Sequence, residues 1–265
     1  MDRSFLSLKS VIEASRRFVC IRTLTYENAA ERDFQRTLFI GRSGDVENTT
    51  FCFLGPDGKK RISWAGRSIR QVFQSPDQMS QWMNQAASYY DAQRRKEGLK
   101  PEPIEALPVV PNVRLAVDTA AADDVPLVVL YGTSPAQISH LKAAAAGLAW
   151  KPEFIGRLTY VSTMQASDLG AVQLKAMKPG YLIIQPTKFG LAGKLLTRAE
   201  PAATSEQLTS ALRQGLQEYQ PRFLQGFDYM RAGQQAGAFW ETKLPVTDID
   251  EARARERTRS RVPHR

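Results

Sequence analysis

The sequence predicts an α/β protein made of two tandem domains, each with a mixed sheet packed between helices. Three observations support this prediction: a proline-rich segment divides the chain, strand-like apolar runs alternate with capped helical patterns, and the elements follow a similar order on both sides of the division. The dividing segment, residues 97–113, reads EGLKPEPIEALPVVPNV and has four prolines and no periodicity. Because proline at this density disfavours helix and sheet alike, we predict a linker at 99–111 between domains at 1–98 and 112–222.

Composition is typical of globular proteins. The 265 residues are enough for two hydrophobic cores, and 43% hydrophobic and 24% charged residues are ordinary values. No apolar run approaches the roughly 18 residues that a membrane helix needs, and the N-terminus lacks the apolar stretch of a signal peptide. We therefore expect a cytoplasmic protein that does not insert into a membrane.

The first domain is predicted to start with a short helix at 8–16 and a strand at 18–24, which is rich in β-branched and aromatic residues. A helix follows at 28–39, with Asn28 as its N-cap and Glu31 three residues later, as in a capping box. The strand therefore leads through a tight corner directly into a helix.

A hairpin and a long helix complete the first domain. Residues 49–54 and 61–65 are predicted strands joined by Gly-Pro-Asp-Gly, a strong hairpin signal. Ser75 and Pro76 then open a helix that continues to Lys96, because serine is favoured at the N-cap and proline at the first helical position. Apolar residues at 3–4 spacing predict that one face of this helix lies in the core.

The second domain repeats this order with more elements before its hairpin. A helix is predicted at 112–125, a strand at 126–132, and a helix from Ser134 and Pro135 to residue 150. The remaining predicted elements are a strand at 157–163, a helix or loop at 164–176, a hairpin at 180–186 and 194–199, and a helix at 205–223.

This order of elements, with a helix before the first strand, resembles the thioredoxin fold in tandem. The resemblance covers residues 5–96 and 112–220 and implies three-layer α/β/α domains. The sequence FIGR occurs at 39–42 and again at 154–157, each time where the first long helix should end. The stretch between this sequence and the hairpin is shorter in the first domain, so the first domain would be a trimmed variant without the middle strand and helix.

The residues at the corners depart from the family pattern. Thioredoxin-like enzymes have C-x-x-C where the first core strand meets its helix, because the helix N-terminus stabilises a thiolate. Here residues 25–28 read Thr-Tyr-Glu-Asn and residues 132–135 read Gly-Thr-Ser-Pro. The family's second mark, a cis-proline before the hairpin, is matched by Pro179 in the second domain. The resemblance therefore implies the fold without dithiol exchange.

The corner at 25–28 and two nearby loops form the predicted contact surface. Backbone N–H groups at a helix N-terminus can bind an anion or a carbonyl, although Glu27 itself can fill that position. Arginines in the glycine-containing loops would bind a carboxylate or phosphate if they converge; the alternative is exposed arginines with no fixed partner. The candidate binding residues are Thr25, Tyr26, Glu27, Asn28, Arg42, Trp64, Arg67 and Arg70.

The two cysteines, Cys20 and Cys52, lie in predicted strands. Our main interpretation is a pair of buried, inert thiols among apolar neighbours, since burial raises a thiol pKa. Alternatively, loss of the middle elements would make the two strands neighbours, and the cysteines could form a disulfide if they lie directly opposite each other. Thiol redox chemistry through this pair is the enzymatic alternative for the function.

Positive charge is concentrated at the C-terminus. The net charge is +9, and residues 253–265, with six Arg and one Glu, contribute +5 of it. Such a tail can bind nucleic acid or an anionic surface through counterion release, or it can be a solvated, disordered terminus. Nucleic acid is therefore expected only through 253–265. The extension before it, 223–252, is too aromatic for a linker, and we expect it to dock on the second domain or on a partner subunit.

Motifs for catalysis are absent from the sequence. The only histidines are His140 and His264, and no His, Cys, Asp or Glu set has metal-ligand spacing. Nucleophile-elbow, P-loop and dinucleotide-binding motifs do not occur either. We expect no cofactor, no metal and no catalytic residue. The sequence favours a non-catalytic binding or assembly scaffold for a protein, peptide or small ligand, and a second copy of the chain is one candidate partner.

Overall fold

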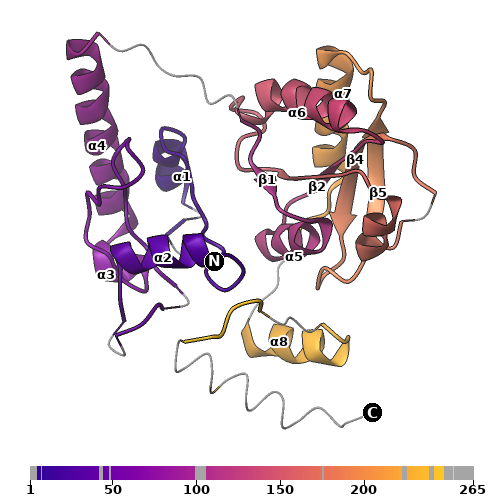
Figure 1. Ribbon diagram of the computed structural model, residues 1–265. Coiled ribbons are helices and arrows are strands. Elements are labelled where there is room, and N and C mark those ends of the chain that lie inside the picture. The colour runs from indigo at the N-terminus through magenta and orange to yellow at the C-terminus, as the bar shows by residue number, and fades with distance from the viewer. Residues whose placement is uncertain are drawn as a thin grey trace. The chain divides into compact units, whose positions relative to one another are not determined.

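The computed structural model describes residues 5–6, 8–41, 44–47, 49–98, 106–174, 176–222, 226–238, 242–247 and 253 (Figure 1). The chain divides into two compact units: unit 1 comprises Met1–Pro101 and Trp240–Arg265, and unit 2 comprises Glu102–Phe239. Helices combine with a five-stranded mixed sheet, so the predicted α/β class is confirmed. No helix in the described part of the chain has the length and apolarity needed to cross a bilayer.

Unit 2 contains the sheet, whose strands lie in the order β1-β3-β2-β4-β5. β1, β3 and β2 are parallel to one another, whereas β4 runs antiparallel to both of its neighbours, β2 and β5. The strands are β1 Val109–Val110, β2 Leu127–Tyr131, β3 Thr159–Thr163, β4 Gly180–Pro186 and β5 Gly193–Ala199. The predicted strands of the second domain are thus found close to their expected positions. The prediction of a linker at 99–111 is wrong at its end, because β1 lies there and pairs with β3.

Helices cover both faces of this sheet (Figure 1). Strand β2 is buried along its whole length because alternate side chains point to opposite faces. Val128 and Leu130 pack on the face covered by α6 and α7, while Leu127 and Val129 pack on the face covered by α5 and η1. These helices are α5 Val113–Asp123, α6 Pro135–Ala149, η1 Ala166–Val172 and α7 Ser205–Glu218.

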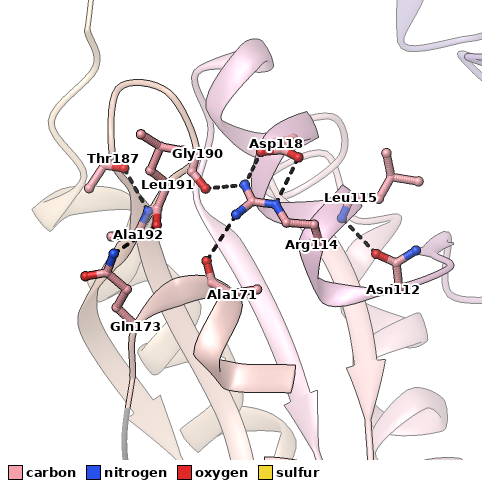
Figure 2. A network of polar contacts seen from close by, with 10 residues as sticks. All are labelled: Asn112, Arg114, Leu115, Asp118, Ala171, Gln173, Thr187, Gly190, Leu191 and Ala192. Carbon is pink, nitrogen blue, oxygen red and sulfur yellow. Dashed lines mark hydrogen bonds and ion pairs between the residues drawn. The ribbon is translucent and has the colours of Figure 1, made fainter. Parts of the chain in front are cut away.

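A partly buried ion pair joins α5 to the rest of unit 2 (Figure 2). The Arg114 guanidinium donates to the Asp118 carboxylate one turn along the helix, to the Gly190 carbonyl in the β4–β5 turn, and to the Ala171 carbonyl of η1 at 3.4 Å. Partial burial raises the pKa of the Asp118 carboxyl, against the opposing effect of Arg114. The pair therefore fixes three separate segments on one face of the sheet.

Helix α8, Gly226–Gln235, follows α7 in the same unit. Its Gly233 lies against the Phe189 ring of the β4–β5 turn, where an added Cβ would be 3.3 Å from the ring. Helix α8 of the predicted extension at 223–252 therefore packs on unit 2. The expectation is wrong for residues 242–247, which belong to unit 1 and contact Tyr26 and Val46 there.

Unit 1 is helical in its described part and has no strand there. Its helices are α1 Lys9–Ser15, α2 Ala29–Leu38, α3 Ile69–Val72 and α4 Pro76–Lys96. Its core is rich in aromatic residues: Phe53 contacts the rings of Phe18, Phe51, Phe73 and Trp82, with centroids 4.7–5.9 Å apart. Packing of these rings, together with α1 and α4, replaces a sheet as the source of cohesion.

The prediction of a strand at 18–24 is wrong. The predicted hairpin segments pair with each other, but only through isolated antiparallel bridges at Phe51–Gly66 and Leu54–Arg61. Residues 18–24 pair with neither segment, and Val19 and Ile21 are 54% and 64% exposed. A β-branched run becomes a strand only when a neighbouring strand satisfies its backbone groups. The described part of unit 1 is therefore not the three-layer domain that the resemblance implied for 1–98.

We expect Gly190→Ala to destabilise unit 2 by about 3 kcal/mol, because left-handed backbone strain and a steric clash combine there. Gly190 has φ +68°, and an added Cβ would lie 2.5 Å from the Asp118 carboxylate and 3.1 Å from its Cα. Gly156→Ala is the matched control, since Gly156 has φ +71° but no atom within 4 Å of the new Cβ.

The control should cost only about 1 kcal/mol, the backbone term alone. Both free energies can be measured from hydrogen exchange of the β4 amides, which report the opening of unit 2. Equal costs for the two variants would contradict the close packing of the β4–β5 turn on α5.

Candidate functional site

The corner at residues 25–28 forms a turn that leads into α2, as the sequence predicts. The Asn28 side chain caps the helix by accepting hydrogen bonds from the N–H groups of Ala30 and Glu31 at 2.9 and 3.2 Å. The Glu31 carboxylate accepts from the Leu24 N–H at 2.6 Å, so it reaches back past the N-cap residue. Two of the N–H groups that could have bound an external anion are thus already satisfied within the chain.

A buried glutamine holds this corner in place, and the sequence analysis missed it. Gln35 of α2 is 4% exposed. Its carbonyl oxygen accepts from the hydroxyls of Thr23 and Thr25, both at 2.6 Å, and its amide donates to the Glu47 carbonyl at 2.7 Å and to the Thr50 hydroxyl at 3.1 Å. One side chain therefore joins the corner to Glu47 and Thr50, which follow α2. The available signal was an amide three residues before Leu38, on the buried side of the helix.

Of the predicted loop arginines, the two that the structure describes, Arg67 and Arg70, contact different groups. Arg67 pairs with the Glu47 carboxylate of the chain itself, at 3.0 Å, and Glu47 lies so close to Gly41 that an added Cβ would clash with it. The Arg70 guanidinium lies over the Phe5 ring, 5.2 Å from its centroid. Trp64 is 81% exposed. Arg42 lies outside the described residues, so the prediction for it stays a prediction.

The C-terminal segment 242–247 lies on the predicted contact surface. The Leu244 N–H donates to the Tyr26 carbonyl at 2.9 Å, and the Thr247 hydroxyl donates to the Val46 carbonyl at 3.5 Å, the outer limit of a hydrogen bond. The two acceptors belong to the corner and to the neighbouring loop, which Gln35 joins. The corner therefore contacts a segment that is more than 200 residues away in sequence.

Both cysteines have free thiols, and neither is fully buried. Cys20 is exposed and Cys52 is partly buried, so the prediction of two buried thiols is wrong, because residues 18–24 do not enter a sheet. Loss of solvent around the sulfur atoms nevertheless raises the pKa of both thiols, and Arg61 opposes this only in part at Cys52. A raised pKa leaves little nucleophilic thiolate at neutral pH.

The corner of unit 2 lies at the carboxyl end of β2. The Gly132 N–H donates to the Thr163 carbonyl at 3.1 Å, and Ser134 caps α6 by accepting from the Gln137 N–H at 3.2 Å. The prediction of a cis-proline at Pro179 is wrong, since the peptide bond before it is trans. Gly180 makes the turn into β4 instead, with φ +141° and the Ala199 carbonyl where a Cβ would be.

Two further predictions from the sequence concern metal ligands and the basic tail at 253–265. Among the described residues, no group of three or more His, Cys, Asp and Glu side chains could hold a metal ion. In the tail at 253–265 only Arg253 is described, and it is exposed. Binding of nucleic acid through this tail stays a prediction.

We expect both thiols to be detectable without prior reduction and to react slowly at neutral pH, because loss of solvent around each sulfur atom raises the thiol pKa. The rate of maleimide addition to the native chain should rise about tenfold per pH unit between about pH 6 and 8. N-acetylcysteine is the control and should react faster at each pH. A rate that levels off below neutral pH, or a thiol that appears only after reduction, would contradict this expectation and favour the redox alternative.

Comparison of the chain with protein-family models finds no match. A search of curated proteins and a search of solved structures also find no significant match.

Proposed function

We propose that the protein is a non-catalytic binding or assembly scaffold with thioredoxin-like architecture, and that the corner at 25–28 receives an extended peptide segment. The observation that carries this proposal is the contact between residues 242–247 and the carbonyls of Tyr26 and Val46. The Tyr26 and Val46 carbonyls accept hydrogen bonds from residues 242–247 of the chain. A peptide of similar chemistry that displaced this segment would bind to the same two carbonyls.

The order and direction of the strands in unit 2 support the thioredoxin-like part of the proposal. A parallel β-α-β unit is followed by an antiparallel hairpin and a final helix, with α5 on one face and α6 and α7 on the other. Support for a trimmed second copy in unit 1 is limited to the order of helix, hairpin-like bridges and helix. In both units the corner lacks thiols, which favours recognition over dithiol exchange.

The chemistry of the corner favours an extended peptide as its ligand. Both acceptors are main-chain carbonyls, which recognise backbone N–H groups and hydroxyls without strong sequence preference. Leu244 and Val246 of the docked segment are partly buried, so apolar side chains would add affinity. Gln35 bonds to Thr25 and to Glu47, which are the chain neighbours of Tyr26 and Val46. It therefore helps to position the two acceptor carbonyls for one ligand.

The redox alternative is less well supported by the same structure. Cys20 and Cys52 both have raised pKa values, the opposite of what an attacking thiol needs near neutral pH. Binding of nucleic acid through the tail at 253–265 would be a separate activity. It would depend steeply on salt and be lost on deletion of the tail.

The proposal predicts that a labelled peptide with the sequence of residues 241–249, ETKLPVTDI, binds the full-length protein in competition with the chain's own segment. The Leu244→Pro variant has no N–H at this position, so its own segment is held less tightly. We expect the peptide to bind this variant about fivefold more tightly than the wild type, as loss of one hydrogen bond from the competitor implies. Fluorescence anisotropy measures both affinities.

Lys243→Ala is the matched control, because this neighbouring side chain is exposed and the variant keeps the N–H of Leu244; it should bind the peptide like the wild type. A scrambled peptide of the same composition should bind neither protein. The proposal is contradicted if the peptide fails to bind both proteins, or if it binds the wild type and the Leu244→Pro variant equally well.

A further inference from the structure

A crevice in unit 2 lies at the point where the chain leaves two neighbouring parallel strands in opposite directions. After β2 the chain continues into α6 on one face of the sheet, whereas after β3 it continues into η1 on the other face. β2 and β3 are adjacent and parallel. In open α/β sheets, the crevice outside the carboxyl ends of two such strands is where ligands bind.

A pocket of about 340 Å³ occupies this position, within the size range of small-molecule sites. Its lining comes from the three elements that meet there: α6, the carboxyl end of β3 with the following residues, and η1. The lining residues are Ile138, Lys142, Ser162, Thr163, Met164, Gln165 and Asp168. The pocket is therefore formed by the topology of the sheet, not by a single loop.

The pocket lining contains one positively charged side chain, Lys142, and one negatively charged side chain, Asp168. Asp168 is oriented by the buried Thr163, whose hydroxyl donates to one carboxylate oxygen at 2.5 Å and accepts from the Gln165 N–H at 3.0 Å. The other oxygen of Asp168 accepts no hydrogen bond from a described residue. Lys142 is partly buried and makes no ion pair with any described residue. Each charge therefore has bonding capacity left for a ligand.

We propose that this crevice binds a small zwitterion, an α-amino acid with an aliphatic side chain. Lys142 would bind the carboxylate and Asp168 the ammonium group, and Ile138 and Met164 would contact the apolar side chain. A ligand with both charges is favoured because each charge of the pocket then gains a charge-assisted hydrogen bond. The inference is independent of the corner in unit 1, since it uses other residues in another unit.

L-leucine is the test ligand, and isothermal titration of the full-length protein measures its affinity. Two analogues of similar shape each lack one charge: 4-methylpentanoic acid has no ammonium group, and 3-methylbutylamine has no carboxylate. We expect each analogue to bind at least about tenfold more weakly than leucine, the usual effect of losing one charged hydrogen bond. Lys142→Met and Asp168→Asn should each weaken leucine binding by a similar factor.

Lys194→Met and Glu206→Gln are the matched controls, because they remove an exposed charge of the same sign elsewhere in unit 2 and should leave leucine binding unchanged. All four substituted side chains are exposed or partly buried, and thermal unfolding of each variant verifies the fold. The proposal is overturned if leucine does not bind, if 4-methylpentanoic acid binds as tightly as leucine, or if the Lys142 and Asp168 variants bind leucine like the wild type.

Discussion

The buried amide of Gln35 is the interaction on which the surface of unit 1 depends. A buried amide must satisfy its donors and acceptor within the protein, and Gln35 does so by bonding to Thr25 in the corner and to the Glu47 carbonyl in the loop after α2. These hydrogen bonds hold the two loops together. The carbonyls that contact the C-terminal segment belong to these loops, so a buried side chain of α2 helps to fix the surface to which it is hydrogen-bonded.

Unit 2 depends on a different constraint, the alternation of side chains along a strand that is buried on both faces. β2 packs into two cores at once, and the helices that follow β2 and β3 cover opposite faces of the sheet. The crevice at the strand ends lies where these two connections diverge. Arg114 and Asp118 then fix α5, η1 and the β4–β5 turn on one face. The two units thus present surfaces of different chemistry: backbone acceptors in unit 1, and one charge of each sign in unit 2.

Capping residues and apolar runs in the sequence correctly predicted the helices and strands that depend on neighbouring residues in the chain. Ser75 with Pro76 and Ser134 with Pro135 begin helices as their capping chemistry requires, and the apolar run 127–131 is a buried strand. The strand expected at 18–24 is not found, because strand formation depends on a partner that β-propensity cannot reveal. The hydrogen bonds of Arg114 to Ala171 and Gly190 and the contact of Leu244 with Tyr26 join residues far apart in sequence, and a single sequence carries no signal for such pairs. At the candidate site, the corner could be predicted, whereas its occupant could not.

The central claim is that the segment 242–247 lies on the corner of unit 1, and hydrogen exchange of the Leu244 amide in the full-length protein tests it most directly. The account predicts that this amide exchanges at least about tenfold more slowly than in an unstructured peptide, because its N–H is bound to the Tyr26 carbonyl. The Lys243 amide, which donates to no described residue, is the internal reference and should show little protection. Exchange of Leu244 at the rate of an unstructured peptide would contradict the account.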